Sequence, residues 1–413
     1  LWQSALLALR GTRFTPRIAA EIPAAQLDRV DAFSILQMDI HLVDPVLGTW
    51  FMLRGLRWIL DAGEPLRALY SLSDLYQQLS LRGTPRAKRR SRQLLAQITE
   101  LAKTIDSPVA RAILRTAESV SLWYRGEPAA VPDVSYEAER LWREHAADQS
   151  LGGYMARFNV VATRIGAFYQ LADYRAFARE LDAALTEARA TENCAAELSM
   201  ALNETLLDEI RDRGEHAVER LMRQRQQLPQ GGFAVYHALH MMAVCCAASS
   251  TGRYAWGLCV LEEEWPRFLR SSVQRARAIA MGANLWRTRL LLHASVSDPR
   301  AAVRAAAETA KFWRSMGGAQ AEGGLAVAQA RAAYIAGDSA TALARLRRVV
   351  ELAALEPQPN RYALGRMIGG EEGAELCADA QRKLLEQGVV NPLAYVRGRF
   401  PELFREHGGG DAR

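Results

Sequence analysis

Lysine is scarce in this sequence, although the chain is basic. The formal net charge is +6, from 52 lysines and arginines against 46 acids, and lysine occurs only at positions 88, 103, 311 and 383. A basic balance made almost wholly of arginine is expected of a GC-rich genome. The net charge by itself therefore does not indicate a nucleic-acid partner.

Cysteine is also sparse, and no two cysteines have the C-x-x-C spacing of a metal or redox pair. The five cysteines are Cys194, Cys245, Cys246, Cys259 and Cys377. An odd, scattered set in apolar helical contexts predicts buried thiols in a reducing compartment. We therefore expect a cytoplasmic protein.

Long apolar runs are missing as well. The longest nearly apolar segment, Ala238 to Ser249, contains a histidine and is too short to cross a bilayer, which needs about 20 apolar residues. No secretory or lipidation signal is visible, so we expect no membrane partner. Because the sequence opens on Leu1 rather than Met, we expect it to be a piece of a longer protein.

The motifs of common catalytic folds are absent. No Gly-Lys pair occurs, and the kinase motifs, a G-x-S-x-G elbow and H-E-x-x-H are all missing. The segment Gly369 to Gly373 superficially resembles a phosphate loop, but Glu371 and Glu372 would repel an anion and suit the first turn of a helix. We expect a non-enzymatic chain with no catalytic residues and no cofactor. An unrecognised helical enzyme stays open and would need a polar pocket with perturbed acids or histidines.

One group of residues could in principle hold a metal ion. His237 and His240 lie three apart, with Cys245 and Cys246 shortly after them. A zinc site needs ligands that converge on one point, and these spacings place side chains on different faces of a helix. We expect helix packing here and no metal, with a zinc site as the weaker alternative.

The segment from Ala326 to Val350 predicts two helices folded back on each other. Small residues recur at helical spacing before Gly337, and Ala342, Leu346 and Val349 form an apolar stripe after it. Gly337 suits the left-handed conformation that ends a helix, and Asp338 can cap the next one. This pattern is typical of a tetratricopeptide-like hairpin.

Similar turn signals recur along the chain at intervals of about forty residues. They are placed at Gly63, Gly126, Ala172, Gly214, Gly252, Asp298 and Gly337. The wide first interval predicts a divergent hairpin around Pro85 to Asp106. Because strand patterns are nearly absent, we predict an all-α fold: an α-solenoid of tandem tetratricopeptide-like helical hairpins that forms a right-handed superhelix.

The distribution of the hairpin pattern along the chain predicts three segments. Residues 1–48 are expected to form a divergent first repeat or a linker, because the hairpin pattern is weak there. Residues 49–405 are expected to form the helical-repeat array. Residues 406–413 are expected to be a disordered tail.

A basic cluster lies at the start of the helix predicted after Pro85. The cluster contains six cations, as many as the net charge of +6, and they are Arg82, Arg86, Lys88, Arg89, Arg90 and Arg92. Cations in the first turns of a helix oppose its dipole. The cluster is predicted as a patch for an acidic protein partner, as a patch for nucleic-acid phosphates, or as a solvated surface without a partner. No aromatic residues are interleaved to stack single-stranded bases.

The end of the chain resembles a known family. Gly369-Gly370, Leu384, Gln387-Gly388, Asn391-Pro392, Pro401 and Phe404 resemble the end of the helical-repeat region of large bacterial serine/threonine kinases. In these proteins, frequent in myxobacteria, a kinase domain precedes a signal-transduction ATPase module and a tetratricopeptide-like array. The resemblance implies that such an array senses a ligand or partner for signal transduction and regulates the attached module. No catalytic motif of that family lies in this chain.

We therefore expect a non-catalytic protein-interaction or sensor scaffold. The resemblance implies that it is the regulatory repeat arm of a larger kinase–ATPase signalling protein. Its partner would be the kinase or ATPase module of the same parent chain, or another acidic protein. The alternative is a helical scaffold that binds nucleic acid or anions through Arg82–Arg92.

Overall fold

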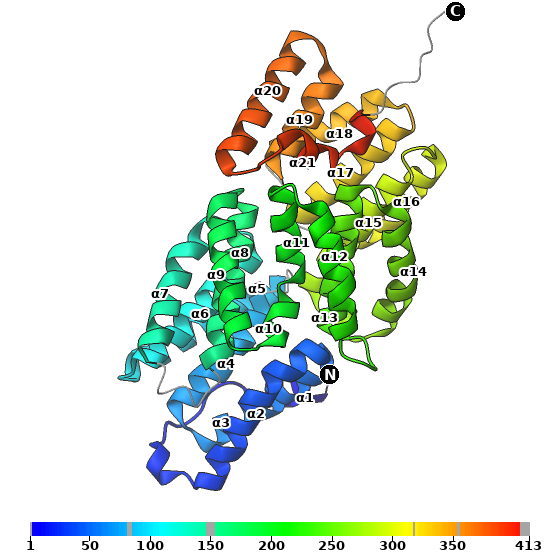
Figure 1. The fold of residues 1–413 in the computed structure, drawn as a ribbon. Coiled ribbons are helices and arrows are strands. Elements are labelled where there is room, and N and C mark those ends of the chain that lie inside the picture. The colour runs from blue at the N-terminus through cyan, green and yellow to red at the C-terminus, as the bar shows by residue number, and fades with distance from the viewer. Residues whose placement is uncertain (1, 81–84, 146–152, 317–318, 353–355, 405–413) are drawn as a thin grey trace, which may run out of the picture. The chain divides into compact units, whose positions relative to one another are not determined.

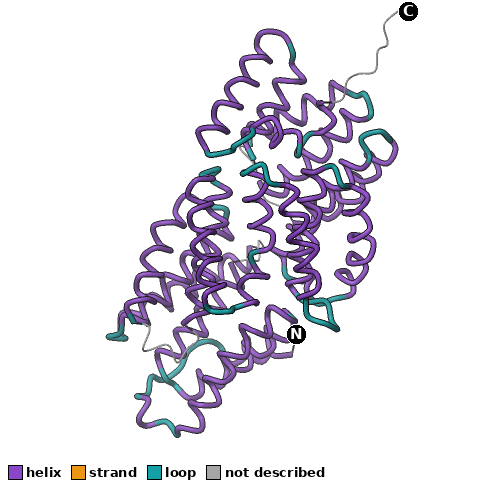
Figure 2. Tube along the Cα trace, in the orientation of Figure 1, coloured by secondary structure: helices purple, strands orange, loops and turns teal. Residues whose placement is uncertain are grey.

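The computed structural model describes residues 2–80, 85–145, 153–316, 319–352 and 356–404. Within these ranges every regular element is a helix and none is a strand (Figures 1 and 2). The all-α prediction is confirmed. None of the helices in these ranges combines the length and apolarity needed to cross a bilayer.

The chain divides into two compact units. Unit 1 comprises Leu1–Leu171, Gly232–Val235 and Ser271–Ala278, and unit 2 comprises Ala172–Gly231, Tyr236–Arg270 and Ile279–Arg413. The elements of unit 1 are α1 (Trp2–Arg10), η1 (Ala19–Glu21), α2 (Ala24–Val43), α3 (Pro45–Ala62), α4 (Pro65–Ser80), α5 (Pro85–Thr104), α6 (Pro108–Arg125), η2 (Pro128–Ala130), α7 (Val131–Glu144), α8 (Gly153–Gln170) and η5 (Val273–Arg275).

The remaining elements have most or all of their residues in unit 2. They are α9 (Tyr174–Ala190), α10 (Cys194–Ser199), α11 (Ala201–Ile210), α12 (Gly214–Gln224), η4 (Arg225–Gln227), α13 (Val235–Thr251), α14 (Tyr254–Arg270), α15 (Arg277–Ala294), α16 (Pro299–Met316), α17 (Ala319–Ile335), α18 (Ser339–Glu351), α19 (Pro357–Ile368), α20 (Gly370–Gln387), α21 (Pro392–Arg397) and η6 (Pro401–Phe404).

Local capping explains where many helices begin and end. Gly337 has φ of 83° and ends α17, while Asp338 caps α18 by accepting a hydrogen bond from the backbone N–H of Thr341 at 3.0 Å. Ala342, Leu346 and Val349 are the buried residues of α18. The hairpin predicted from this segment is therefore present, because its turn and its apolar stripe are both set locally.

The other predicted turns also fall between consecutive helices, but Gly214 has a different role from Gly337. The left-handed residue of that turn is Asp212, with φ of 55°, and Gly214 is the first residue of α12. A Cβ atom at Gly214 would lie 2.6 Å from the Thr251 side chain. Glycine is needed there for close packing against α13, not for a positive φ.

The segment around Pro85 to Asp106 does not form the predicted hairpin. It holds one helix, α5, and α4 packs against both α5 and α6. The buried face of α5 comprises Ala87, Ser91, Leu94, Ile98 and Ala102. This single apolar stripe continues without a break, so nothing in the segment favours a chain reversal.

The division into residues 1–48, 49–405 and 406–413 stays a prediction. Its first boundary falls within α3, and α2 packs against α3. Residues 406–413 lie outside the described residues.

The segment from Gly388 to Phe404, which we call the closing segment, contacts several helices of unit 2. The backbone N–H of Val390 donates to the carbonyl of Ile210 at 3.0 Å, and the hydroxyls of Tyr395 and Tyr174 lie 3.0 Å apart. Further along, Arg399 pairs with Glu209 of α11 at 3.1 Å. In Figure 1 the red segment of α21 lies beside α19. This closing segment therefore contacts residues that come from α9, α11 and α19.

The closing segment also contains half of a buried ion pair. Glu402 of η6 accepts two hydrogen bonds from the guanidinium of Arg331 of α17, at 2.7 and 2.9 Å. The two side chains are only 2% and 3% exposed. A charge in such a place depends on its partner, because water cannot replace the lost interaction.

The substitution Glu402→Gln should strongly destabilise unit 2. It leaves the Arg331 guanidinium buried without a counter-charge, which costs about 3–5 kcal/mol. Denaturant unfolding followed by circular dichroism measures the loss. The control is Glu351→Gln, which breaks an exposed pair with Arg348 and should change stability little. Equal effects of both substitutions would contradict the importance of the buried pair.

Unit 1 contains one carboxyl with an unusual environment. Asp74 of α4 accepts a hydrogen bond from the Gln37 amide at 2.5 Å. Burial raises the pKa of the Asp74 carboxyl from 3.8 to about 7, and the hydrogen bond from Gln37 opposes this rise. Between these two values the folded chain holds a proton that the unfolded chain lacks. This contribution to stability is complete below about pH 4 and is lost as the pH rises towards 7.

The substitution Asp74→Asn should therefore flatten the pH dependence of stability between pH 4 and 7. One proton accounts for a slope of at most about 1.4 kcal/mol per pH unit. Thermal unfolding of the wild type and the variant at several pH values measures the difference. Asp28→Asn, at an exposed position of α2, should keep the wild-type slope. A wild-type slope in the Asp74 variant would show that Asp74 does not carry the proton.

Candidate functional site

The predicted basic cluster lies on the first two turns of α5. Arg86, Lys88, Arg89 and Arg92 are exposed and Arg90 is partly exposed, while Arg82 lies outside the described residues. At 100° per residue, these five cations spread over about 200° of the helix circumference, with Arg89 opposite the buried face and Lys88 and Arg90 at its two edges. The α5 helix thus brings all five described members of the cluster to one solvent-facing surface, which we call the α5 basic face.

The cations of the α5 basic face are electrostatically uncompensated. None of the five forms an ion pair with another described residue. Some other arginines of unit 1 pair with acids, as Arg115 does with Glu118 at 2.7 Å and Arg140 with Glu144 at 2.6 Å, whereas the scattered exposed residues Arg13, Arg29 and Arg111 have no ion pair with a described residue. Like charges three or four residues apart repel, and cations in a first turn oppose the helix dipole. This face therefore has a strong positive potential.

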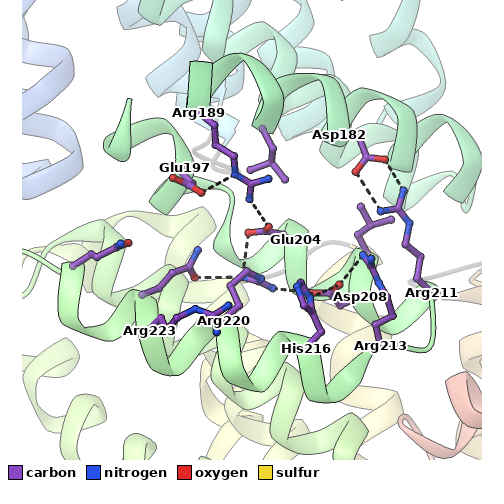
Figure 3. A pocket seen from close by; sticks show the side chains of 14 residues that line it. Asp182, Arg189, Glu197, Glu204, Asp208, Arg211, Arg213, His216, Arg220 and Arg223 are labelled. Atoms are coloured by element: carbon purple, nitrogen blue, oxygen red, sulfur yellow. Dashed lines mark hydrogen bonds and ion pairs between the residues drawn. The ribbon is translucent and has the colours of Figure 1, made fainter. Parts of the chain in front are cut away.

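A second polar site, which the sequence analysis did not predict, lies within unit 2. It is a groove of about 450 Å³ formed by α9, α10, α11, α12 and the segments next to them (Figure 3). Its lining is mainly charged or amide side chains: Asp182, Leu185, Arg189, Glu197, Glu204, Leu207, Asp208, Arg211, Arg213, His216, Arg220, Arg223, Gln224 and Gln227. We call it the arginine groove.

Asp208 is the centre of the ion pairs on one side of the arginine groove. Its side chain is 1% exposed and lies 2.9 Å from Arg213, 3.1 Å from Arg220 and 3.2 Å from His216. Figure 3 shows Asp208 among these three side chains. A carboxylate with several donors around it can remain charged although it is buried.

Glu204 joins the two walls of the groove. It lies between Arg189 of α9, at 2.8 Å, and Arg220 of α12, at 3.2 Å (Figure 3). Arg189 also pairs with Glu197 at 3.0 Å. The hydrogen bonds that Arg189 donates to Glu197 and to Glu204 raise its pKa, and partial burial opposes this rise. These bonds hold the guanidinium groups of Arg189 and Arg220 in fixed positions.

The sequence carries a signal for this groove that was missed. Arg213, His216, Arg220 and Arg223 are three or four residues apart, so they share one face of α12. Glu204 and Asp208 are four apart on α11 in the same way. Each row alone looks like an ordinary solvated helix surface, and only their facing positions in the fold make a groove.

The histidine and cysteine group considered for metal binding is held by other contacts. The Nε2 atom of His240 donates to the carbonyl of Leu221 at 2.9 Å, since a carbonyl can only accept. Burial lowers the pKa of His240 to about 4 and raises that of the Cys245 thiol to about 12. Among the described residues no three His, Cys, Asp or Glu side chains are grouped as metal ligands.

The glycines at positions 369, 370 and 373 have conformational and packing roles. Gly369 has φ of 69° and precedes α20, whose first turn contains Glu371 and Glu372. A Cβ atom at Gly373 would lie 2.3 Å from the carbonyl oxygen of Gly365. The glycines thus allow the turn and the close approach of α19 and α20, and the two acids favour the positive end of the α20 dipole.

Comparison with known proteins gives no family assignment. No family model matches the chain, and neither curated proteins nor solved structures include a significant match. Arguments about function therefore rest on the residues and their geometry.

Proposed function

We propose that this chain is a non-catalytic helical scaffold that docks an acidic segment of a partner protein on the α5 basic face. The observation that carries the proposal is the group of five cations within seven residues that lack ion pairs with the described residues. Uncompensated cations on one surface attract an oppositely charged partner and speed its association.

Two features favour a protein segment over nucleic acid as the partner. The α5 sequence contains no aromatic residue, whereas single-stranded nucleic acid is usually held by stacking on aromatic rings. Seven helical residues also span only about 10 Å, which suits a few neighbouring carboxylates. The alternative is a scaffold that uses the same face for nucleic-acid phosphates or other anions.

The finer architecture and the wider role belong to the same proposal. Consecutive packing of α16, α17, α18, α19 and α20 supports tandem tetratricopeptide-like hairpins in a right-handed α-solenoid. The resemblance of residues 369–404 to the kinase-associated arrays supports a regulatory arm of a larger cytoplasmic bacterial signalling protein. The kinase or ATPase module of the same parent chain would then supply the acidic segment.

Charge reversal on α5 tests the proposal. The probe is a fluorescent oligoglutamate peptide, and its affinity is measured by anisotropy at several salt concentrations. The triple variant Arg86→Glu, Arg89→Glu, Arg92→Glu should bind the peptide at least about tenfold more weakly, since each lost contact is worth a few tenths of a kcal/mol or more. The wild-type affinity should fall as salt increases.

The matched control is Arg300→Glu, Arg304→Glu, Lys311→Glu. These three exposed cations of α16 also lack ion pairs with described residues, and their reversal changes the net charge equally. The control should weaken peptide binding much less than the α5 variant. Equal losses would reduce the effect to net charge and contradict the proposal. Tighter binding of single-stranded DNA than of the peptide through α5 would favour the alternative.

A further inference from the structure

We propose that the arginine groove of unit 2 is a binding site for a small soluble anion that carries two or more phosphate groups. This site is separate from the α5 basic face and does not depend on the function proposed for it. Four features of the groove point to such a ligand: its excess of charged donors, one buried donor without a partner, the ion pairs that orient two of its arginines, and its size.

Hydrogen-bond donors are in excess in the groove. Its lining has five arginines and His216 but only four carboxylates. Each guanidinium offers five N–H donors, and every one of the four carboxylates already pairs with at least one of these arginines. Arg223 is exposed and has no ion pair with another described residue. Charged donors therefore outnumber the carboxylates, although one acceptor of the lining, Oε2 of Glu204, also has no hydrogen-bond partner among the described residues.

Arg220 gives an independent sign of the same deficit. It is 6% exposed, and its Nε atom has no hydrogen-bond partner among the described residues. Its Nη2 atom donates to Thr205 at 3.0 Å and to Asp208 at 3.1 Å, and its Nη1 atom donates to Gln224 at 3.3 Å. A buried donor without an acceptor is costly. An oxyanion bound beside Arg220 would supply this acceptor once the side chain turns towards the groove, because Nε is itself buried.

Two of the five arginines are oriented by acids of the chain itself. Arg189 is held by Glu197 and Glu204, and Arg220 by Glu204 and Asp208. Arginines fixed in this way lose little side-chain entropy when they bind a ligand. The cations of the α5 basic face lack such support. The groove is thus suited to a small ligand that needs defined geometry, and the α5 face to a flexible partner.

Size and lining indicate the class of ligand. A volume of about 450 Å³ lies in the range of small-molecule sites, but such sites are usually mostly apolar. Here only Leu185 and Leu207 are apolar. The planar guanidinium matches phosphate oxygens with paired hydrogen bonds. The five arginines and four carboxylates give the lining a net charge of +1, which favours an anionic ligand over a neutral one.

Calorimetric titration of the full chain with inorganic pyrophosphate tests the proposal, with sodium chloride of equal ionic strength as the reference. The wild type should bind pyrophosphate saturably, and more tightly than orthophosphate. The substitution Arg223→Gln should weaken binding by about tenfold, because it removes a charged donor worth about 1.5 kcal/mol or more. Since Arg223 is exposed and unpaired among the described residues, the variant should fold normally.

Two further variants decide the location. Arg300→Gln removes an exposed, unpaired arginine of α16 and should leave pyrophosphate binding unchanged. The triple α5 charge-reversal variant should also bind pyrophosphate normally, even if it loses the acidic peptide. Absence of saturable binding in the wild type, equal weakening by Arg223→Gln and Arg300→Gln, or loss of binding in the α5 variant would each overturn the proposal.

Discussion

Helix α11 of unit 2 carries three buried carboxylates, and each of them pairs with an arginine. Glu204, Asp208 and Glu209 are each less than a tenth exposed. Transfer of a charged group from water into a protein interior is strongly unfavourable unless ion pairs and hydrogen bonds replace the lost hydration. The arginines around α11 therefore belong to the structural core of unit 2 as well as to its surface.

The three carboxylates of α11 have two sets of partners. Glu204 and Asp208 pair with arginines of the groove, and Glu209 pairs with Arg399 of the closing segment. Arg399 in turn pairs with Glu356 just before α19 at 2.6 Å. One short helix thus links the arginine groove to the end of the chain. This link gives the groove a rigid wall, which a site of defined geometry requires.

Arginine has two different uses in this protein. In unit 2, the guanidinium groups of Arg220, Arg331 and Arg399 are buried against carboxylates. On α5 the cations face solvent without acids beside them. An arginine in an ion pair stabilises the fold and holds its remaining N–H donors in a defined direction. An exposed arginine without an ion pair attracts anionic groups over a longer distance. Both proposed sites follow from this difference, although net charge alone would not separate them.

Local sequence patterns were enough to predict the helices, many of the turns between them and the position of the basic cluster at the start of one helix. These features depend on contacts within about one turn, such as the cap at Asp338 and the apolar stripe of α18. Which charges meet depends instead on how distant parts of the chain pack together. Arg331 and Glu402 are 71 residues apart in the sequence, and Arg399 and Glu209 are 190 apart. The sequence of a helix face with mixed charges does not show whether that face contacts water or another helix. The groove therefore follows only from the way α11 and α12 face each other in the fold.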